Sequence, residues 1–354
     1  MIAAGGTAGH VVPALAVADA LRASGATVSF LGTRDRVEAK LVPEAGYELD
    51  FLAVHGLDRR NPLKALAAVG RAAAAVPAAR RILRRRGADV MMGGGGYIAG
   101  PAGLAARSAR IPLVLTEADS HLGLANRLLA GTAHRVCLAF PIPGLDGDRY
   151  LVTGRPVPNA VLKADRSAAR RRFEIAADDR CLLVFGGSLG ARSINEAALD
   201  ALADRGDRDF HVLHIAGSRD YPEARRRVEA AGATRYTLLE YESSLGDALA
   251  ACDLVLARAG GSVFELAAAG RPAILVPYPH ATAGHQDANA AWMADAGAAA
   301  MVDDAELTGE RVWSEAAALL HDPGRLAAMA AASVSLARPD AARRIADEVL
   351  AARG

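Results

Sequence analysis

Short apolar runs alternate with longer amphipathic stretches along the whole chain of 354 residues. The runs are continuous, which is typical of strands in a sheet that is covered on both faces. Strands that alternate with helices predict a parallel, doubly wound α/β architecture. The predicted strands are 28–32, 49–54, 89–92, 112–115 and 135–140 in the first half, and 181–185, 211–216, 237–241, 254–257 and 273–277 in the second.

This pattern occurs twice, and each half opens with a short strand, a glycine turn and a helix. The turns are residues 5–10 and 186–191, and the stretch 152–159 between the halves carries two prolines and a glycine. We therefore predict two Rossmann-like domains facing a cleft, at residues 1–155 and 156–339, with an amphipathic helix at 340–354 packing back on the first. Only four residues precede the first glycine turn, so we expect a short central strand or missing residues there.

Composition narrows the function classes. Hydrophobic residues make up 52% and charged residues 23% of the chain, which indicates folded domains and not disorder. A net charge of +1 and an aromatic content of 5% argue against a nucleic-acid partner. The three cysteines fit neither a disulfide framework nor a zinc site. With no signal peptide and no long apolar run, we expect a cytoplasmic protein that can still lie on a membrane.

Four glycine clusters follow predicted strands, and such turns let backbone amides approach an anion. Besides the two opening turns they are residues 93–96 and 259–261. Because the P-loop lysine is absent from both opening turns, ATP hydrolysis is disfavoured. A nicotinamide cofactor is also disfavoured, because neither turn is followed about 20 residues later by a well-placed acid at the end of a second strand. Glu265, one turn into the helix after the last cluster, is suited to accept hydrogen bonds from a ribose. Tight turns and an acid favoured by the helix dipole are the plain structural alternatives.

Other polar residues gather where predicted strands end. His285, Gln286 and Asn289 follow the strand at 273–277, and amides suit sugar hydroxyls. His10 begins the first helix, where the helix N-terminus favours a neutral imidazole that can act as a base. Glu117 and Asp119 follow the strand at 112–115, a position suited to a general base. Each of these residues also fits an ordinary polar helix start.

Together these motifs resemble the MurG family, the peptidoglycan branch of glycosyltransferase family 28, over nearly the whole chain. The matching pieces are residues 5–18, 31–46, 95–101, 186–195, 258–272 and 285–290. The resemblance implies the two-domain GT-B fold and no cofactor or metal. It implies transfer of N-acetylglucosamine from UDP-N-acetylglucosamine to the C4 hydroxyl of lipid I, the undecaprenyl-diphosphate-linked N-acetylmuramoyl-pentapeptide, with inversion, giving lipid II and UDP.

The resemblance also assigns residues by matching position. On the acceptor side it places Gly95, Gly96, Tyr97 and Glu117, and our hypothesis is that His10 or Asp119 takes the hydroxyl proton. The expected donor contacts are Thr7, Gly9, Arg155, Ser188, Tyr241, Glu242, Leu245, Gly260, Gly261, Ser262, Glu265, His285 and Gln286.

Three departures from the family pattern affect these assignments. Asp119 stands where an amide is usual, and Pro158 stands where the family has an arginine that contacts diphosphate, so Arg155 is the expected substitute. The donor loop before Glu265 is one residue shorter, which blurs the match at Gly261 and Ser262.

Residues 63–86 mix apolar side chains with six arginines and a lysine, and no acid interrupts them. Such a segment suits an anionic membrane surface, so we expect a peripheral protein on the cytoplasmic face of the cell membrane. We expect Pro77 to break any single long helix here. The alternative is a helix that covers the sheet and has a solvated basic end.

Three other functions stay open from the residues alone. They are a GT-B glycosyltransferase with another acceptor, a UDP-N-acetylglucosamine 2-epimerase, and a silent sugar-nucleotide-binding partner. We also expect other cell-wall synthesis proteins to be partners of this protein.

Overall fold

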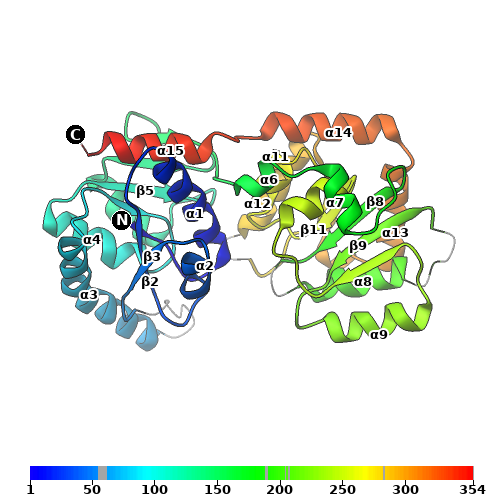
Figure 1. Cartoon of the computed structure of the whole chain (residues 1–354), viewed down its shortest axis with the longest axis horizontal. Helices are drawn as coiled ribbons and strands as arrows, with labels where there is room; N and C mark the ends of the chain where they lie inside the picture. The colour runs from blue at the N-terminus through cyan, green and yellow to red at the C-terminus, as the bar shows by residue number, and fades with distance from the viewer. Residues whose placement is uncertain (55–61, 188–189, 204, 206–207, 282–283, 354) are drawn as a thin grey trace. The chain divides into compact units, whose positions relative to one another are not determined.

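The computed structural model describes residues 1–54, 62–187, 190–203, 205, 208–281 and 284–353, and only the backbone of 62–69. The chain divides into two compact units, residues 1–158 with 338–354 and residues 159–337 (Figure 1). Each unit is an α/β fold around one parallel sheet, which confirms the predicted fold class.

The first unit holds a seven-stranded sheet in the order β3-β2-β1-β4-β5-β6-β7, with every pair parallel. Its strands are β1 (Ile2–Ala3), β2 (Ser29–Gly32), β3 (Glu48–Phe51), β4 (Met91–Gly93), β5 (Leu113–Glu117), β6 (Arg135–Leu138) and β7 (Tyr150–Val152). Its helices are α1 (Ala8–Ala23), α2 (Glu38–Glu44), α3 (Pro62–Arg85), α4 (Ala99–Ala109), α5 (Leu124–Leu129) and α15 (Ala341–Ala351), with the short 3₁₀ turn Ala130–Thr132.

Successive residues of these strands enter two different cores. Met91 packs in a cluster with residues of α3 and α4, whereas Met92 packs in a cluster with residues of α1 and α15. Helix α15 lies alongside α1 (Figure 1). Both faces of the sheet are therefore covered, which explains why the strands read as continuous apolar runs.

The second unit holds a six-stranded sheet in the order β10-β9-β8-β11-β12-β13, again parallel throughout. Its strands are β8 (Arg180–Phe185), β9 (Phe210–Ile215), β10 (Tyr236–Leu239), β11 (Leu254–Ala257), β12 (Ala273–Leu275) and β13 (Ala299–Met301). Its helices are α6 (Asn159–Leu162), α7 (Arg166–Arg172), α8 (Arg192–Leu202), α9 (Tyr221–Ala231), α10 (Leu245–Ala251), α11 (Val263–Ala268), α12 (His285–Asp295), α13 (Gly309–Leu320) and α14 (Pro323–Leu336), with the 3₁₀ turn Asp304–Glu306.

Both sheets reverse their strand order at one point, between β1 and β4 in the first unit and between β8 and β11 in the second. Ligands of open α/β sheets bind outside the carboxyl ends of the strands at such a switch point. All four glycine clusters follow one of these four strands. The fold therefore brings the clusters together in pairs, one pair to each unit.

The prediction that Pro77 breaks the basic segment is wrong, because α3 runs through it from Pro62 to Arg85. Ala75, Ala79 and Leu83 form the buried face of this helix. Pro77 and Ala73, whose carbonyl loses its hydrogen bond to the proline, are exposed, so water can replace the missing donor. Among the described residues, no helix combines the length and the apolar character that a membrane span requires.

Candidate active site

At the switch point of the first sheet, the loop after β4 packs directly on the loop after β1. A Cβ on Gly96 would lie 2.1 Å from the carbonyl oxygen of Gly5, and a Cβ on Gly95 would lie 2.4 Å from Cδ2 of His10. Both glycines also have positive φ angles, of 77° and 95°. The glycine cluster at 93–96 is thus required by close contact of the chain with itself. Of the residues expected on the acceptor side, Gly95 therefore lies against His10, Gly96 against Gly5, and the Tyr97 ring against Gly6.

The buried carboxylate of Glu38, which lies outside the glycine clusters, fixes this pair of loops. Glu38 is fully buried, and its Oε2 accepts a hydrogen bond from Gly6 N at 3.0 Å. Its Oε1 accepts from Thr33 N at 3.0 Å and from Thr33 Oγ1 at 2.7 Å. The Thr33 hydroxyl also lies 3.3 Å from the hydroxyl of Tyr97. Glu38 therefore ties the first turn to the end of β2, and only its place in the resemblance could have indicated this.

His10 is the third residue of α1, and its Nδ1 lies 3.2 Å from Oγ1 of Thr7, the N-cap residue. Burial lowers the pKa of His10, and the positive charge of Arg155 lowers it further. The charges of Asp119 and Glu38 act in the opposite direction. A neutral imidazole at neutral pH follows, in the protonation state that a general base needs.

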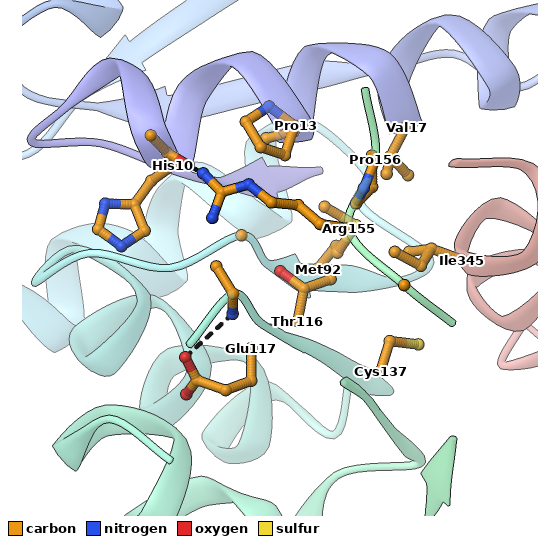
Figure 2. A pocket seen from close by; sticks show the side chains of 15 residues that line it. His10, Pro13, Val17, Met92, Thr116, Glu117, Cys137, Arg155, Pro156 and Ile345 are labelled. Atoms are coloured by element: carbon orange, nitrogen blue, oxygen red, sulfur yellow. Dashed lines mark hydrogen bonds between the residues drawn. The ribbon is translucent and has the colours of Figure 1, made fainter. Parts of the chain in front are cut away.

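A small pocket begins at His10 and continues between α1 and the sheet (Figure 2). Nη2 of Arg155, which follows β7, donates to the carbonyl oxygen of Gly9 at 2.6 Å and so joins the segment after β7 to the first turn of α1. The other labelled side chains around the pocket are Pro13, Val17, Met92, Thr116, Glu117, Cys137, Pro156 and Ile345. Six segments of the first unit that are far apart in sequence therefore meet here.

Glu117 is almost completely engaged by its own loop. Oε1 accepts from the amides of Ala118 and Asp119 at 3.0 and 3.2 Å. Oε2 accepts from Gly123 N at 2.8 Å and from Nδ2 of Asn126 at 2.9 Å. Burial raises the pKa of Glu117, while these hydrogen bonds oppose that shift. The side chain thus holds the loop that carries Asp119, and the predicted acceptor contact of Glu117 stays a prediction.

In the second unit, Gly186 and Gly190, which follow β8, are as closely packed as the glycines after β4. A Cβ on Gly186 would lie 2.3 Å from Ala191 N, and one on Gly190 would lie 2.1 Å from the carbonyl oxygen of Ala216. Ser188 lies outside the described residues. The neighbouring turn after β11 contains Gly260, Gly261 and Ser262, and Nδ2 of Asn289 donates to the carbonyl oxygen of Ala259 at 2.9 Å.

The remaining donor candidates also follow strands of this sheet. Glu265 is half-buried in the first turn of α11, and His285 and Gln286 open α12. Oε1 of Gln286 accepts from Tyr278 N at 2.9 Å, which leaves its amide NH₂ group as the donor for a ligand. Tyr241, Glu242 and Leu245 follow β10. Thr7, Gly9 and Arg155, the other donor candidates, lie with His10 in the first unit.

A buried polar chain beneath the β8–α8 turn was not predicted. Nδ2 of Asn195 donates to the carbonyl oxygen of Ala216 at 2.8 Å and to Asp220 at 2.9 Å, so its Oδ1 is the acceptor for Nε2 of His214, 3.0 Å away. Nδ1 of His214 then accepts from the Tyr236 hydroxyl at 2.7 Å. Burial lowers the pKa of His214 to about 4. In its neutral form the His214 ring therefore donates to Asn195 and accepts from Tyr236, so both ring nitrogens have a hydrogen-bond partner.

Part of the positive charge of residues 63–86, which lie in α3 except for the last one, is neutralised within the first unit. Arg85 donates to Asp50 at 2.5 Å, and Nε of Arg86 donates to the same carboxylate at 2.6 Å. Arg86 also pairs with Glu48. The exposed arginines of this helix that remain for an anionic surface are Arg71, Arg81 and Arg84.

Comparison with known proteins follows the division into two units. Residues 1–138 match the glycosyltransferase family 28 N-terminal domain, and residues 181–345 match the glycosyltransferase family 28 C-terminal domain. A UDP-N-acetylglucosamine--N-acetylmuramyl-(pentapeptide) pyrophosphoryl-undecaprenol N-acetylglucosamine transferase of Moorella thermoacetica is 41% identical, over 99% of this chain and 98% of the relative. A transferase of the same name from Mycolicibacterium paratuberculosis is 44% identical, over 99% and 88%. The crystal structure of Acinetobacter baumannii MurG is 31% identical, with a TM-score of 0.79 over 99% of this chain and 98% of that chain.

Proposed function

The chain belongs to glycosyltransferase family 28, and from this premise we propose the reaction that its two units carry out. The protein is a hexosyltransferase that moves N-acetylglucosamine from UDP-N-acetylglucosamine to N-acetylmuramyl-pentapeptide pyrophosphoryl-undecaprenol, which is lipid I. The product is lipid II, so the reaction belongs to peptidoglycan synthesis. The observation that carries this conclusion is identity of 41–44% to transferases of that name over 99% of the chain.

In the chemistry that we propose, the C4 hydroxyl oxygen of the acceptor attacks the anomeric carbon of the donor sugar. The bond from that carbon to the diphosphate oxygen breaks, and UDP leaves with the electron pair. Negative charge grows on the leaving diphosphate, and backbone amides at the helix starts after β8 and β11 are suited to stabilise it. Glu265 would accept from the ribose, and Gln286 with His285 would contact the sugar hydroxyls.

The acceptor proton needs a base, and the first unit offers His10 and Asp119. We favour His10 because burial and Arg155 both keep its imidazole neutral. Asp119 would then stabilise the imidazolium that forms, since its charge raises the pKa of His10. In the alternative assignment Asp119 takes the proton and His10 orients the acceptor.

We further propose that the protein is peripheral on the cytoplasmic face of the cell membrane. The acceptor is a lipid, and α3 presents Arg71, Arg81 and Arg84 at its surface. Each basic residue near an anionic surface contributes on the order of 1 kcal/mol to binding. Because Arg85 and Arg86 are paired with acids, we expect them to contribute less. Binding to vesicles with and without anionic lipid tests this proposal.

A transfer assay with radiolabelled UDP-N-acetylglucosamine tests the reaction. The assay is run with and without a short-chain lipid I analogue. We expect label in the lipid product only when the analogue is present. Epimerised donor in the tube without acceptor would instead support a 2-epimerase. Donor binding with no transfer would support another acceptor or a silent binder.

A further inference from the structure

The segment that follows β10 is held in place by an ion pair from a different helix. Arg172, the last residue of α7, donates from Nη2 to Oε2 of Glu242 at 2.7 Å. Its Nη1 donates to Oδ2 of Asp247 at 2.7 Å. Oε1 of Glu242 accepts from the amide of Ser244 at 2.6 Å. One guanidinium therefore fixes the segment 241–245 and the first turn of α10.

Glu242 is turned inward while its neighbour is turned outward. The Glu242 side chain is only 4% exposed, whereas Tyr241 is 61% exposed. Because the Glu242 side chain is buried and each of its carboxylate oxygens already accepts a hydrogen bond from the chain, it is directed away from a ligand. Its backbone and the Tyr241 ring are the parts of the segment that remain for recognition.

We propose that Arg172 is a positioning residue that sets the selectivity of this protein for uracil. The inference rests on the proposed function, in which Tyr241, Glu242 and Leu245 lie against the base. A base that is read by the backbone of a short segment is recognised only while that segment keeps one conformation. Arg172 supplies this constraint, because its planar group bridges two carboxylates that a lysine ammonium cannot hold in the same geometry.

Removing Arg172 leaves the buried Glu242 carboxylate without its cation. The carboxylate then has to reach water, and it can do so only by moving the segment 241–245. In the proposed function, the ribose and diphosphate contacts lie on other turns, after β8 and β11, whose residues this ion pair does not include. Loss of Arg172 should therefore weaken recognition of the base and spare recognition of the rest of the nucleotide.

Binding of UDP and CDP to the full-length chain, measured by calorimetry, tests the inference. The two nucleotides share ribose and diphosphate and differ only in the base. We expect Arg172→Met to raise the Kd for UDP about tenfold, which corresponds to about 1.4 kcal/mol, with little change for CDP. The CDP-to-UDP ratio of Kd values should then fall by the same factor. Arg172→Lys should lose part of this selectivity.

The matched control is Arg225→Met, which breaks an exposed pair with Glu229 on α9. We expect this variant to bind both nucleotides like the parent chain. An unchanged Kd ratio in Arg172→Met, or equal weakening of both nucleotides, would overturn the inference. If Arg172→Met does not fold, the same ratio in Arg172→Lys decides. A parent chain that does not bind UDP would contradict the proposed function itself, which separates the two failures.

Discussion

Replacing Glu38 by glutamine tests whether the first glycine turn depends on one buried carboxylate. The change keeps the shape of the side chain and removes its charge. Three donors meet this carboxylate, namely Gly6 N, Thr33 N and Thr33 Oγ1. A glutamine has only one carbonyl oxygen, so its NH₂ group must face a backbone N–H in either orientation.

The loss can be estimated from the hydrogen bonds that disappear. With the oxygen toward Thr33, the Gly6 amide loses its acceptor, and with the oxygen toward Gly6, the Thr33 amide does. A hydrogen bond to a charged group contributes about 1.5–3 kcal/mol, and an unsatisfied buried donor costs about 1–3 kcal/mol. Because these terms overlap, we expect Glu38→Gln to lower the free energy of unfolding by about 2–4 kcal/mol.

Urea unfolding of Glu38→Gln, followed by far-UV circular dichroism, measures this loss. Both tryptophans, Trp292 and Trp313, lie in the second unit, so their fluorescence reports separately on that unit. The matched control is Glu44→Gln at the end of the same helix, where the exposed carboxylate lies 3.9 Å from Lys40. The control should change stability by less than about 0.5 kcal/mol. A Glu38→Gln curve that overlays the control would mean that the first glycine turn does not depend on the Glu38 carboxylate.

Four further predictions concern single residues. His10→Gln should lower kcat by about 10²–10⁴ if His10 is the base, whereas a larger loss in Asp119→Asn would assign that role to Asp119. Arg155→Met removes a charge that lowers the pKa of His10, so the acidic limb of kcat/KM against pH should move to higher pH; a limb that stays in place would contradict this coupling. Tyr236→Phe leaves Nδ1 of buried His214 without its donor and should destabilise the chain by about 1–3 kcal/mol in urea unfolding. Because the folded pKa of His214 is about 4 and the ordinary value is 6.5, stability from this neutral ring should fall as pH falls from about 6.5 to about 4.

The sequence predicted the sheets because their strands are apolar on both faces. The sequence pattern did not predict β7 and β13, because of where these two strands lie in their sheets. Both are three-residue strands at the edge of a sheet, and their residues are half-buried or exposed, so their apolar runs, Tyr150–Val152 and Ala299–Met301, are too short to mark a strand. Helix α3 shows the converse error, since a proline on an exposed face did not interrupt a helix whose other face is packed.

The candidate site was predicted less completely than the fold. Glycine turns and the polar residues after strands are local patterns, and the structure places the glycine turns at the two switch points, whereas most of the polar residues follow β5, β10 and β12. The groups that hold them are non-local. Glu38 reaches Gly6 across 32 residues, and Arg172 reaches Glu242 across 70. Such pairs leave no periodic signal, because each partner alone looks like an ordinary charged residue.

We expect this chain to transfer N-acetylglucosamine to the C4 hydroxyl of lipid I. The most direct measurement compares a short-chain lipid I analogue with the same analogue lacking that hydroxyl, in the presence of radiolabelled UDP-N-acetylglucosamine. We expect label in the intact analogue and none in the 4-deoxy analogue. Label in both would place the new bond on another oxygen, and label in neither would contradict the assignment of the acceptor.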